Sequence, residues 1–124
     1  MAEFKEIFEA YGANYQDTMG RFMGNETMYL KILDMLFRDK NMELLGKALD
    51  AGDMMGAFEA AHTLKGVAAN MGLTPLYQAV TEILEPLRAK ECRDDYADLY
   101  QAIQYEFQKV EQLWRDLSGG CIHE

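Results

Sequence analysis

The sequence lacks most of the features that would favour a β-sheet, a membrane span or a nucleotide site. It has no run of alternating β-branched residues, so an all-α fold is expected. Its apolar runs fall well short of the roughly 20 residues that a membrane-spanning helix needs. A glycine-rich phosphate loop and a Gly-x-Ser-x-Gly segment are both missing. These absences argue against membrane insertion, direct use of a nucleotide and serine-hydrolase chemistry.

Cysteine, proline and positive charge are also scarce. Cys92 and Cys121 are far apart in the sequence and form no recognisable disulfide framework. The acidic N-terminus has no hydrophobic signal region, so a reducing cytoplasm is the expected location. The net charge of −9 argues against nucleic-acid binding, which requires a basic face.

Apolar residues recur at helical spacing through most of the chain, which is long enough for one domain over 1–124. A kink is expected at 38–41, and residues 118–124 are expected to form a frayed tail. Four long helices joined by short turns predict an antiparallel four-helix bundle, with one or two short N-terminal helices packed against it. The predicted helices are 3–11, 15–23, 26–51 (one long helix or two nearly in line), 54–71, 75–89 and 94–117. Short polar residues are expected to cap the second to fifth of these helices: Asn14, Asn25, Asp53 and Thr74. The buried stripe of the helix 75–89 is expected to consist of Leu76, Val80, Ile83, Leu84 and Leu87.

The predicted helix 54–71 carries a single histidine among small and apolar residues. With Leu64 at the centre of the buried face, six apolar residues fall within about 60° of it at 100° per residue. His62 falls about 160° away and is therefore expected to face solvent. The six apolar residues are Ala57, Ala60, Ala61, Val67, Ala68 and Met71.

The neighbours of His62 suit phosphoryl transfer. Lys65, one turn away, would neutralise an anion attached to the imidazole. Gly66, the next residue, would leave space beside the ring, although glycine inside a helix costs up to about 1 kcal/mol relative to alanine. The simpler interpretation is an ordinary surface histidine, but that interpretation leaves the glycine unexplained.

These residues resemble the histidine-containing phosphotransfer (HPt) domain family of bacterial phosphorelays. Residues 61–66 read AHTLKG, residues 70–73 read NMGL, and the upstream segment 48–53 reads ALDAGD. The resemblance extends over about residues 14–117. It implies that His62 is the phosphoacceptor, that Lys65 neutralises the phosphate and that Gly66 provides clearance for docking.

The resemblance implies a phosphorelay intermediate rather than an enzyme. His62 would accept a phosphoryl group from a receiver-domain aspartate and pass it to another receiver. The expected partners are response-regulator receiver domains, a hybrid sensor histidine kinase, or both. Mg²⁺ is expected on the receiver, and no cofactor is expected on this chain. The chain is expected to be a monomer. The alternative is a helical-bundle interaction module that is not phosphorylated. Receiver-docking candidates are Phe58, Glu59, Ala69, Asn70 and Met35.

A second apolar stripe lies along the outer side of the predicted helix 26–51. Its members recur every seven residues, about 140–180° from the core face centred on Leu33. One alternative is that the N-terminal helices cover the stripe with Phe4, Ile7, Phe8 and Phe22. The other is that the stripe forms part of the docking surface. A third is that part of the stripe is covered and part is used for docking. The stripe consists of Met28, Met35, Met42 and Leu49, flanked by Ile32 and Leu45.

No metal site is expected. Cys121, His123 and Glu124 offer two strong zinc ligands and a carboxylate, but on a tail expected to be mobile. Glu82 and Glu85 are three residues apart on one helix. The only Glu-x-x-His of the sequence, at 59–62, is expected to face away from the core, and a single outward copy cannot build a di-metal cage. Solvated helix charges explain these two glutamates better.

Overall fold

The computed structural model describes residues 4–118, which are all-helical apart from turns and loops. The helix boundaries lie within a few residues of the predicted ones, and of the two alternatives for the segment 26–51 the structure has two helices. The elements are α1 (Phe4–Tyr11), α2 (Tyr15–Arg21), α3 (Glu26–Leu36), α4 (Asn41–Ala51), α5 (Met54–Asn70), α6 (Thr74–Arg88) and α7 (Tyr96–Leu117).

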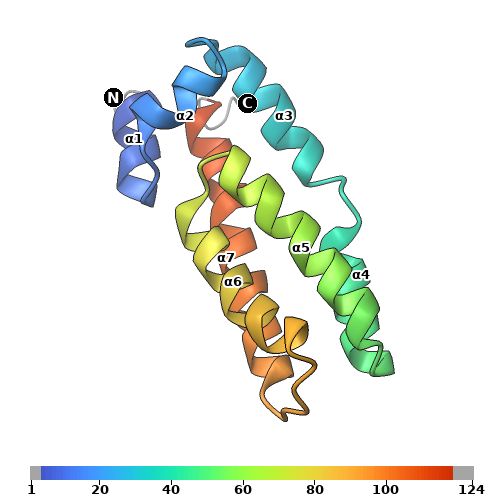
Figure 1. Cartoon of the computed structure of the whole chain (residues 1–124). Coiled ribbons are helices and arrows are strands. Elements are labelled where there is room, and N and C mark those ends of the chain that lie inside the picture. The colour runs from blue at the N-terminus through green and yellow to red at the C-terminus, as the bar shows by residue number, and fades with distance from the viewer. Residues whose placement is uncertain (1–3, 119–124) are drawn as a thin grey trace.

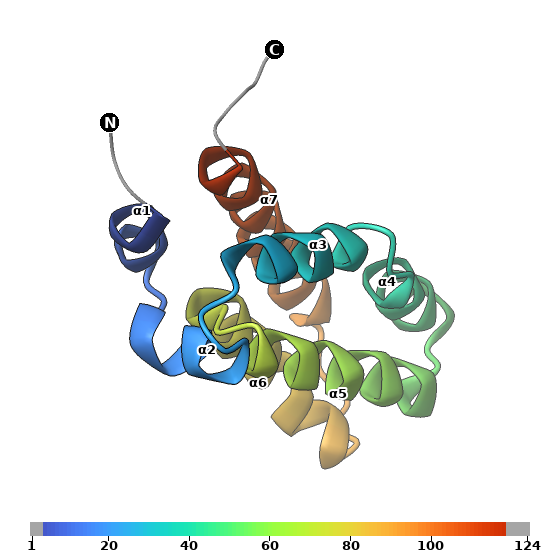
Figure 2. The same ribbon diagram turned by 90° about the horizontal axis from the view of Figure 1, so that it is seen from above.

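The long helices form a closed bundle, with α3 and α4 sharing one side (Figure 1). Helix α4 packs on α5, α5 on α6 and α6 on α7, and α7 returns to contact both α3 and α4. Figure 2 shows this arrangement along the bundle, with α1 beside α7. The predicted four-helix bundle with short N-terminal helices packed against it is confirmed.

The break between α3 and α4 changes which residues face the core. Helix α3 ends at Leu36 and α4 begins at Asn41, whose backbone N–H donates to the Asp39 carboxylate at 2.7 Å. A continuous helical wheel placed Leu45 on the outer flank, but Leu45 is fully buried. The expectation was wrong because the turn at 37–40 resets the helical register.

The outer apolar stripe is split by the same break. Met28 and Met35 on α3 remain 44% and 65% exposed, so of the two alternatives for the stripe, cover by the N-terminal helices does not apply to them. Met42 and Leu49 on α4 are half-buried and pack against the core. The N-terminal aromatic residues instead face the inner side of α3, where Tyr29 lies.

Tyr29 is the centre of an aromatic cluster, here called the N-terminal cap, which joins α1 and α2 to the bundle. The Tyr29 ring lies 5.1–6.2 Å, centroid to centroid, from three phenylalanine rings in edge-to-face contacts. Its hydroxyl donates to the backbone carbonyl of Met71 at 2.7 Å. The N-terminal cap consists of Phe4, Phe8, Tyr15, Phe22 and Tyr29.

Helix α7 is bound to both halves of the interrupted side through hydrogen bonds to backbone carbonyls. The Trp114 indole donates to Leu30 at 3.1 Å, and the Tyr100 hydroxyl donates to Met42 at 2.8 Å. A Cβ atom at Gly46 would lie only 2.6 Å from that hydroxyl, so the close approach of Tyr100 requires glycine there. These bonds hold α3 and α4 in place despite the break between them.

The core contains the predicted stripe of α6: Leu76, Val80, Ile83, Leu84 and Leu87 are all buried. Pro86 lies inside α6, which continues to Arg88 beyond it. Thr74 is the first residue of this helix, and not its cap as the Thr-Pro pair suggested, since Leu73 occupies the cap position. Over residues 4–118, no helix is both long and apolar enough to cross a membrane.

Candidate functional site

Helix α5 begins at a well-defined cap, which sets the rotation of the helix from its first turn. Gly52 adopts φ of +71°, a left-handed conformation that favours glycine and ends α4. The Asp53 side chain then accepts a hydrogen bond from the backbone N–H of Gly56 at 3.0 Å. The predicted capping role of Asp53 is therefore confirmed.

The two faces of α5 differ as the helical spacing predicts. Ala57, Ala60, Ala61, Leu64, Ala68 and Met71 are at most 4% exposed and pack into the core. Val67, the remaining residue predicted for this face, is half-buried and packs against the core from its edge. His62 is exposed, together with Glu59, Gly66 and Ala69. The small residues of the buried face let α5 pack closely against its neighbours, while the histidine stays on the surface.

The His62 imidazole contacts an aromatic ring one turn earlier on the same helix. The Phe58 and His62 rings are stacked, with centroids 5.8 Å apart and an angle of 28° between their planes. Within residues 4–118, no hydrogen bond engages the imidazole nitrogens. A ring held by its face keeps both nitrogens available, which is what a nucleophilic or acceptor role requires.

Lys65 lies half-buried on the side of α5 that faces α6. Its ammonium is 5.9 Å from the centroid of the Tyr77 ring, a cation–π contact. In the part of the chain that the structure describes, Lys65 forms no ion pair. Such a contact contributes only about 0.5–1 kcal/mol at an exposed site, so the ammonium remains able to pair with an anion.

Gly66 has open space around it. A Cβ atom built at Gly66 would meet no atom within 4 Å outside its own helix. Packing inside the chain therefore does not require glycine at this position. A constraint on this position therefore has to come from what approaches the surface from outside.

The structure places four of the five docking candidates on α5 and one elsewhere. Phe58 is half-buried, while Glu59, Ala69 and Asn70 are exposed along the same helix as His62. Met35 is exposed but belongs to α3. The five candidates therefore do not all lie on one helix, although each has an accessible side chain.

Three residues near the site had no separate role in the sequence interpretation. Tyr77 lies beneath the Lys65 ammonium, and the Arg88 guanidinium lies 5.8 Å from the Phe58 ring centroid. Both residues belong to α6, and they reach the site because α6 packs against α5. Arg21 donates to the carbonyls of Asn70 and Ala69 at 3.0 and 3.1 Å, which complements the negative end of the α5 dipole.

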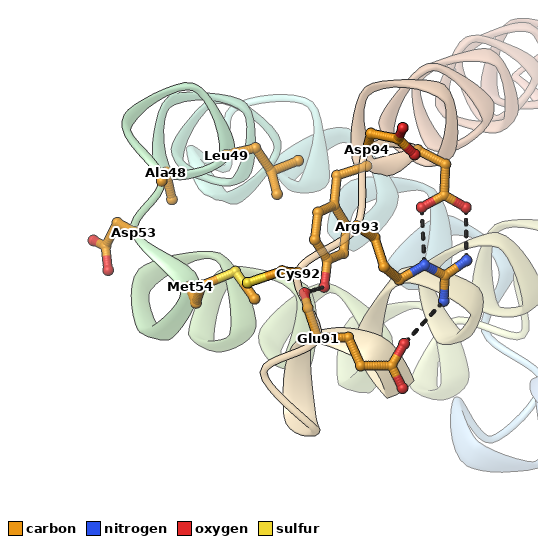
Figure 3. A pocket seen from close by; sticks show the side chains of 11 residues that line it. Ala48, Leu49, Asp53, Met54, Glu91, Cys92, Arg93 and Asp94 are labelled. Carbon is orange, nitrogen blue, oxygen red and sulfur yellow. Dashed lines mark hydrogen bonds and ion pairs between the residues drawn. The ribbon is translucent and has the colours of Figure 1, made fainter.

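A pocket of about 890 Å³ lies between the α4–α5 turn and the loop after α6 (Figure 3). Within it Arg93 donates to Asp95 at 2.9 and 2.6 Å and to Glu91 at 3.4 Å. The hydrogen bonds from Arg93 hold the pKa of Asp95 below its usual value. His62 and Lys65 do not line this pocket, and Arg93 is already paired, so the pocket is separate from the histidine face.

The alternative metal sites gain no support from the described residues. Between residues 4 and 118, no three histidine, cysteine or acidic side chains gather closely enough to hold a metal ion. Glu82 and Glu85 are both exposed, and Glu85 pairs with Arg88 at 2.8 Å. Cys121, His123, Glu124 and the predicted frayed tail, apart from Ser118, lie outside the described residues.

Within residues 4–118, the helical bundle exposes a single histidine, with a lysine and a glycine close to it on the same helix. Residues 35–116 match the family model described as the Hpt domain, and this match covers more than half of the chain. The chain belongs to the Hpt domain family. No curated protein and no solved structure matches it. Hpt domains act as phosphocarriers in histidine phosphotransfer and interact with the receiver domains and kinases of phosphorelays.

Proposed function

We propose that His62 accepts a phosphoryl group from the aspartyl phosphate of a receiver domain and passes it to an aspartate on another receiver. The observation that carries this proposal is the exposure of His62 on α5, with its nitrogens free of hydrogen bonds within residues 4–118. The family match extends over the whole of α5 and supports the same assignment. The chain is a carrier in this scheme, and the receiver supplies the activated phosphate.

The transfer requires an unprotonated imidazole nitrogen. That nitrogen forms a bond to phosphorus while the bond from phosphorus to the aspartyl oxygen breaks. The aspartate carboxylate leaves with the electron pair of the broken bond, and the phosphoryl group is held as a phosphoramidate. The reverse steps, on a second receiver, return His62 to its starting state.

Lys65 and Gly66 support this chemistry in different ways. The Lys65 ammonium, which forms no ion pair within residues 4–118, would neutralise charge on the phosphorylated imidazole. Gly66 would leave room for the receiver surface to reach the ring, since its surroundings in the free chain are open. Phe58, Glu59, Ala69 and Asn70 would border the contact.

We assign the Mg²⁺ ion of the reaction to the receiver. Mg²⁺ prefers oxygen ligands, whereas the groups next to His62 are an ammonium, a glycine and an aromatic ring, with Glu59 as the one nearby carboxylate on its helix. The chain would act in the cytoplasm. It would act as a monomer, since the transfer needs only the α5 surface of one copy.

The test is the chemistry of the phosphorylated chain. The purified protein is mixed with a phosphorylated receiver and Mg²⁺, and then with a second, unphosphorylated receiver. We expect a protein-bound phosphate that is labile in acid and stable in alkali, maps to His62 and moves to the second receiver. Binding to the receiver without phosphate transfer would instead favour a non-phosphorylated interaction module.

A further inference from the structure

The orientation of the His62 imidazole is not fixed by the backbone, so a contact with another side chain is needed to restrict it. An exposed histidine side chain rotates about two bonds and populates several staggered conformations. Within residues 4–118, the His62 ring stacks on the ring of Phe58. The rings are four residues apart on α5, a spacing that places side chains on the same face of a helix.

Phe58 is itself held more firmly than His62. It is half-buried, and its side chain packs against the hydrophobic core. The Arg88 guanidinium from α6 lies 5.8 Å from the Phe58 ring centroid, and Arg88 pairs with Glu85 on its own helix. Phe58 therefore connects an exposed ring on α5 with groups fixed by the core and by α6.

A face contact is a suitable way to hold a nucleophilic imidazole. Both nitrogens lie at the edge of the ring, so a partner stacked on the face occupies neither of them. A hydrogen bond from a neighbouring donor would hold the ring as well, but it would occupy the lone pair that must attack phosphorus. The stack restricts the ring and leaves the lone pair free.

We propose that Phe58 is a positioning residue, which holds the His62 imidazole by stacking so that a ring nitrogen is oriented toward the incoming phosphoryl group. This role rests on the proposed function of His62. It differs from the docking role predicted from the sequence, because it acts on the orientation of the nucleophile and not on the affinity of the receiver. Arg88 assists by holding the Phe58 ring.

The kinetic test separates orientation from docking. The initial rate of phosphoryl transfer to the chain is measured against the concentration of phosphorylated receiver, for the wild type, Phe58→Leu and Phe58→Tyr. We expect Phe58→Leu to lower the saturating rate by about tenfold, since small misplacements of reacting groups are costly. The concentration at half-saturation should change little. Phe58→Tyr, which keeps the stack, should restore the saturating rate.

A matched variant controls for stability. Phe107 is also half-buried and aromatic, but it packs against Phe37 in the contact between α7 and the end of α3. Phe107→Leu should lower the melting temperature without lowering the saturating rate. If Phe107→Leu slows transfer as much as Phe58→Leu does, general loosening of the bundle explains the effect and the positioning role is overturned.

Proton NMR of the unphosphorylated chain tests the geometry independently of any receiver. Stacking on Phe58 should shift the carbon-bound ring protons of His62 upfield, and Phe58→Leu should abolish that shift. If the wild-type chain is phosphorylated but Phe58→Leu keeps the same proton shift or the same saturating rate, the positioning role alone is overturned. A wild-type chain that accepts no phosphoryl group would overturn the proposed function, and the positioning role with it.

Discussion

The outward face of α5 and the N-terminal cap are built from opposite kinds of residue. The face around His62 is open: Gly66 has no neighbour within 4 Å of a Cβ position, and Glu59 and Ala69 are exposed. The N-terminal cap instead buries large aromatic rings, with Phe8 and Tyr29 fully inaccessible. One region is accessible to a partner, whereas the other contributes to stability.

The two regions are nevertheless connected through the end of α5. Tyr29 of the N-terminal cap donates to the carbonyl of Met71, where the helix terminates. Arg21, which lies next to Phe22 of the cap in the sequence, donates to the carbonyls of Asn70 and Ala69. His62 precedes Asn70 by eight residues, or about 12 Å along the helix axis. The N-terminal cap thus anchors one end of the histidine helix without covering its reactive face. Function and stability should therefore respond to different substitutions.

The largest expected effect is the loss of phosphoryl acceptance in His62→Gln. His62 is exposed, so the free energy of unfolding should change by no more than about 0.5 kcal/mol. The assay is transfer from a phosphorylated receiver, together with thermal melting. His123→Gln, which alters the only other histidine of the sequence, is the control and should retain transfer. Transfer that persists without His62 would rule it out as the acceptor.

Phe8→Ala should have the reverse effect. Phe8 is fully buried and contacts three rings of the N-terminal cap, so its truncation should lower the free energy of unfolding by about 3–5 kcal/mol. Denaturant unfolding measures this loss. Phosphoryl transfer below the lowered melting temperature should stay near that of the wild type. Tyr105→Ala, at a side chain 59% exposed, is the control and should cost little.

Gly66→Leu should impair docking without destabilising the chain. Leucine is preferred to glycine inside a helix by under about 1 kcal/mol, and the structure leaves space for it. Transfer from the receiver should slow markedly, because the new side chain would project beside His62. Gly20→Leu is the matched control, since Gly20 is a helical glycine in similarly open space on α2. Equal transfer rates in the two variants would contradict the clearance role.

Lys65→Ala should slow transfer and shorten the lifetime of the phosphorylated chain without abolishing either. We expect an effect of about tenfold on the rate, smaller than the loss of a buried oxyanion donor, because Lys65 is partly solvated. Lys47→Ala, at an exposed lysine paired with Glu43 on α4, is the control. A phosphorylated state of unchanged rate and lifetime would show that Lys65 does not neutralise the phosphate.

The sequence alone could predict those features that depend on the spacing of residues within one helix. The buried face centred on Leu64 and the exposure of His62 follow from 3.6 residues per turn. The caps at Asn14, Asn25 and Asp53 follow from short polar side chains placed before helical segments, and each accepts the expected hydrogen bond. These interactions are local, so no knowledge of the other helices was needed.

Features that depend on contacts between helices could not be predicted in this way. The burial of Leu45 depends on where the turn at 37–40 ends, and the position of Tyr77 under Lys65 depends on how α6 packs against α5. The Phe58–His62 stack lies between these cases. Its spacing of four residues was visible in the sequence, but the stacked orientation depends on the packing of Phe58 against the core.

Among the substitutions aimed at phosphoryl transfer, the smallest expected effect on it belongs to Met35→Glu, which tests whether the accessible surface extends from α5 to α3. Met35 is 65% exposed, so the substitution should change the free energy of unfolding by no more than about 0.5 kcal/mol. If Met35 belongs to the docking surface, the concentration of phosphorylated receiver at half-saturation should rise, while the saturating rate is retained. Met23→Glu, at a methionine 93% exposed before α3, is the control and should leave both values unchanged. Unchanged affinity in Met35→Glu would remove Met35 from the docking surface and confine that surface to α5 and its immediate neighbours on α6.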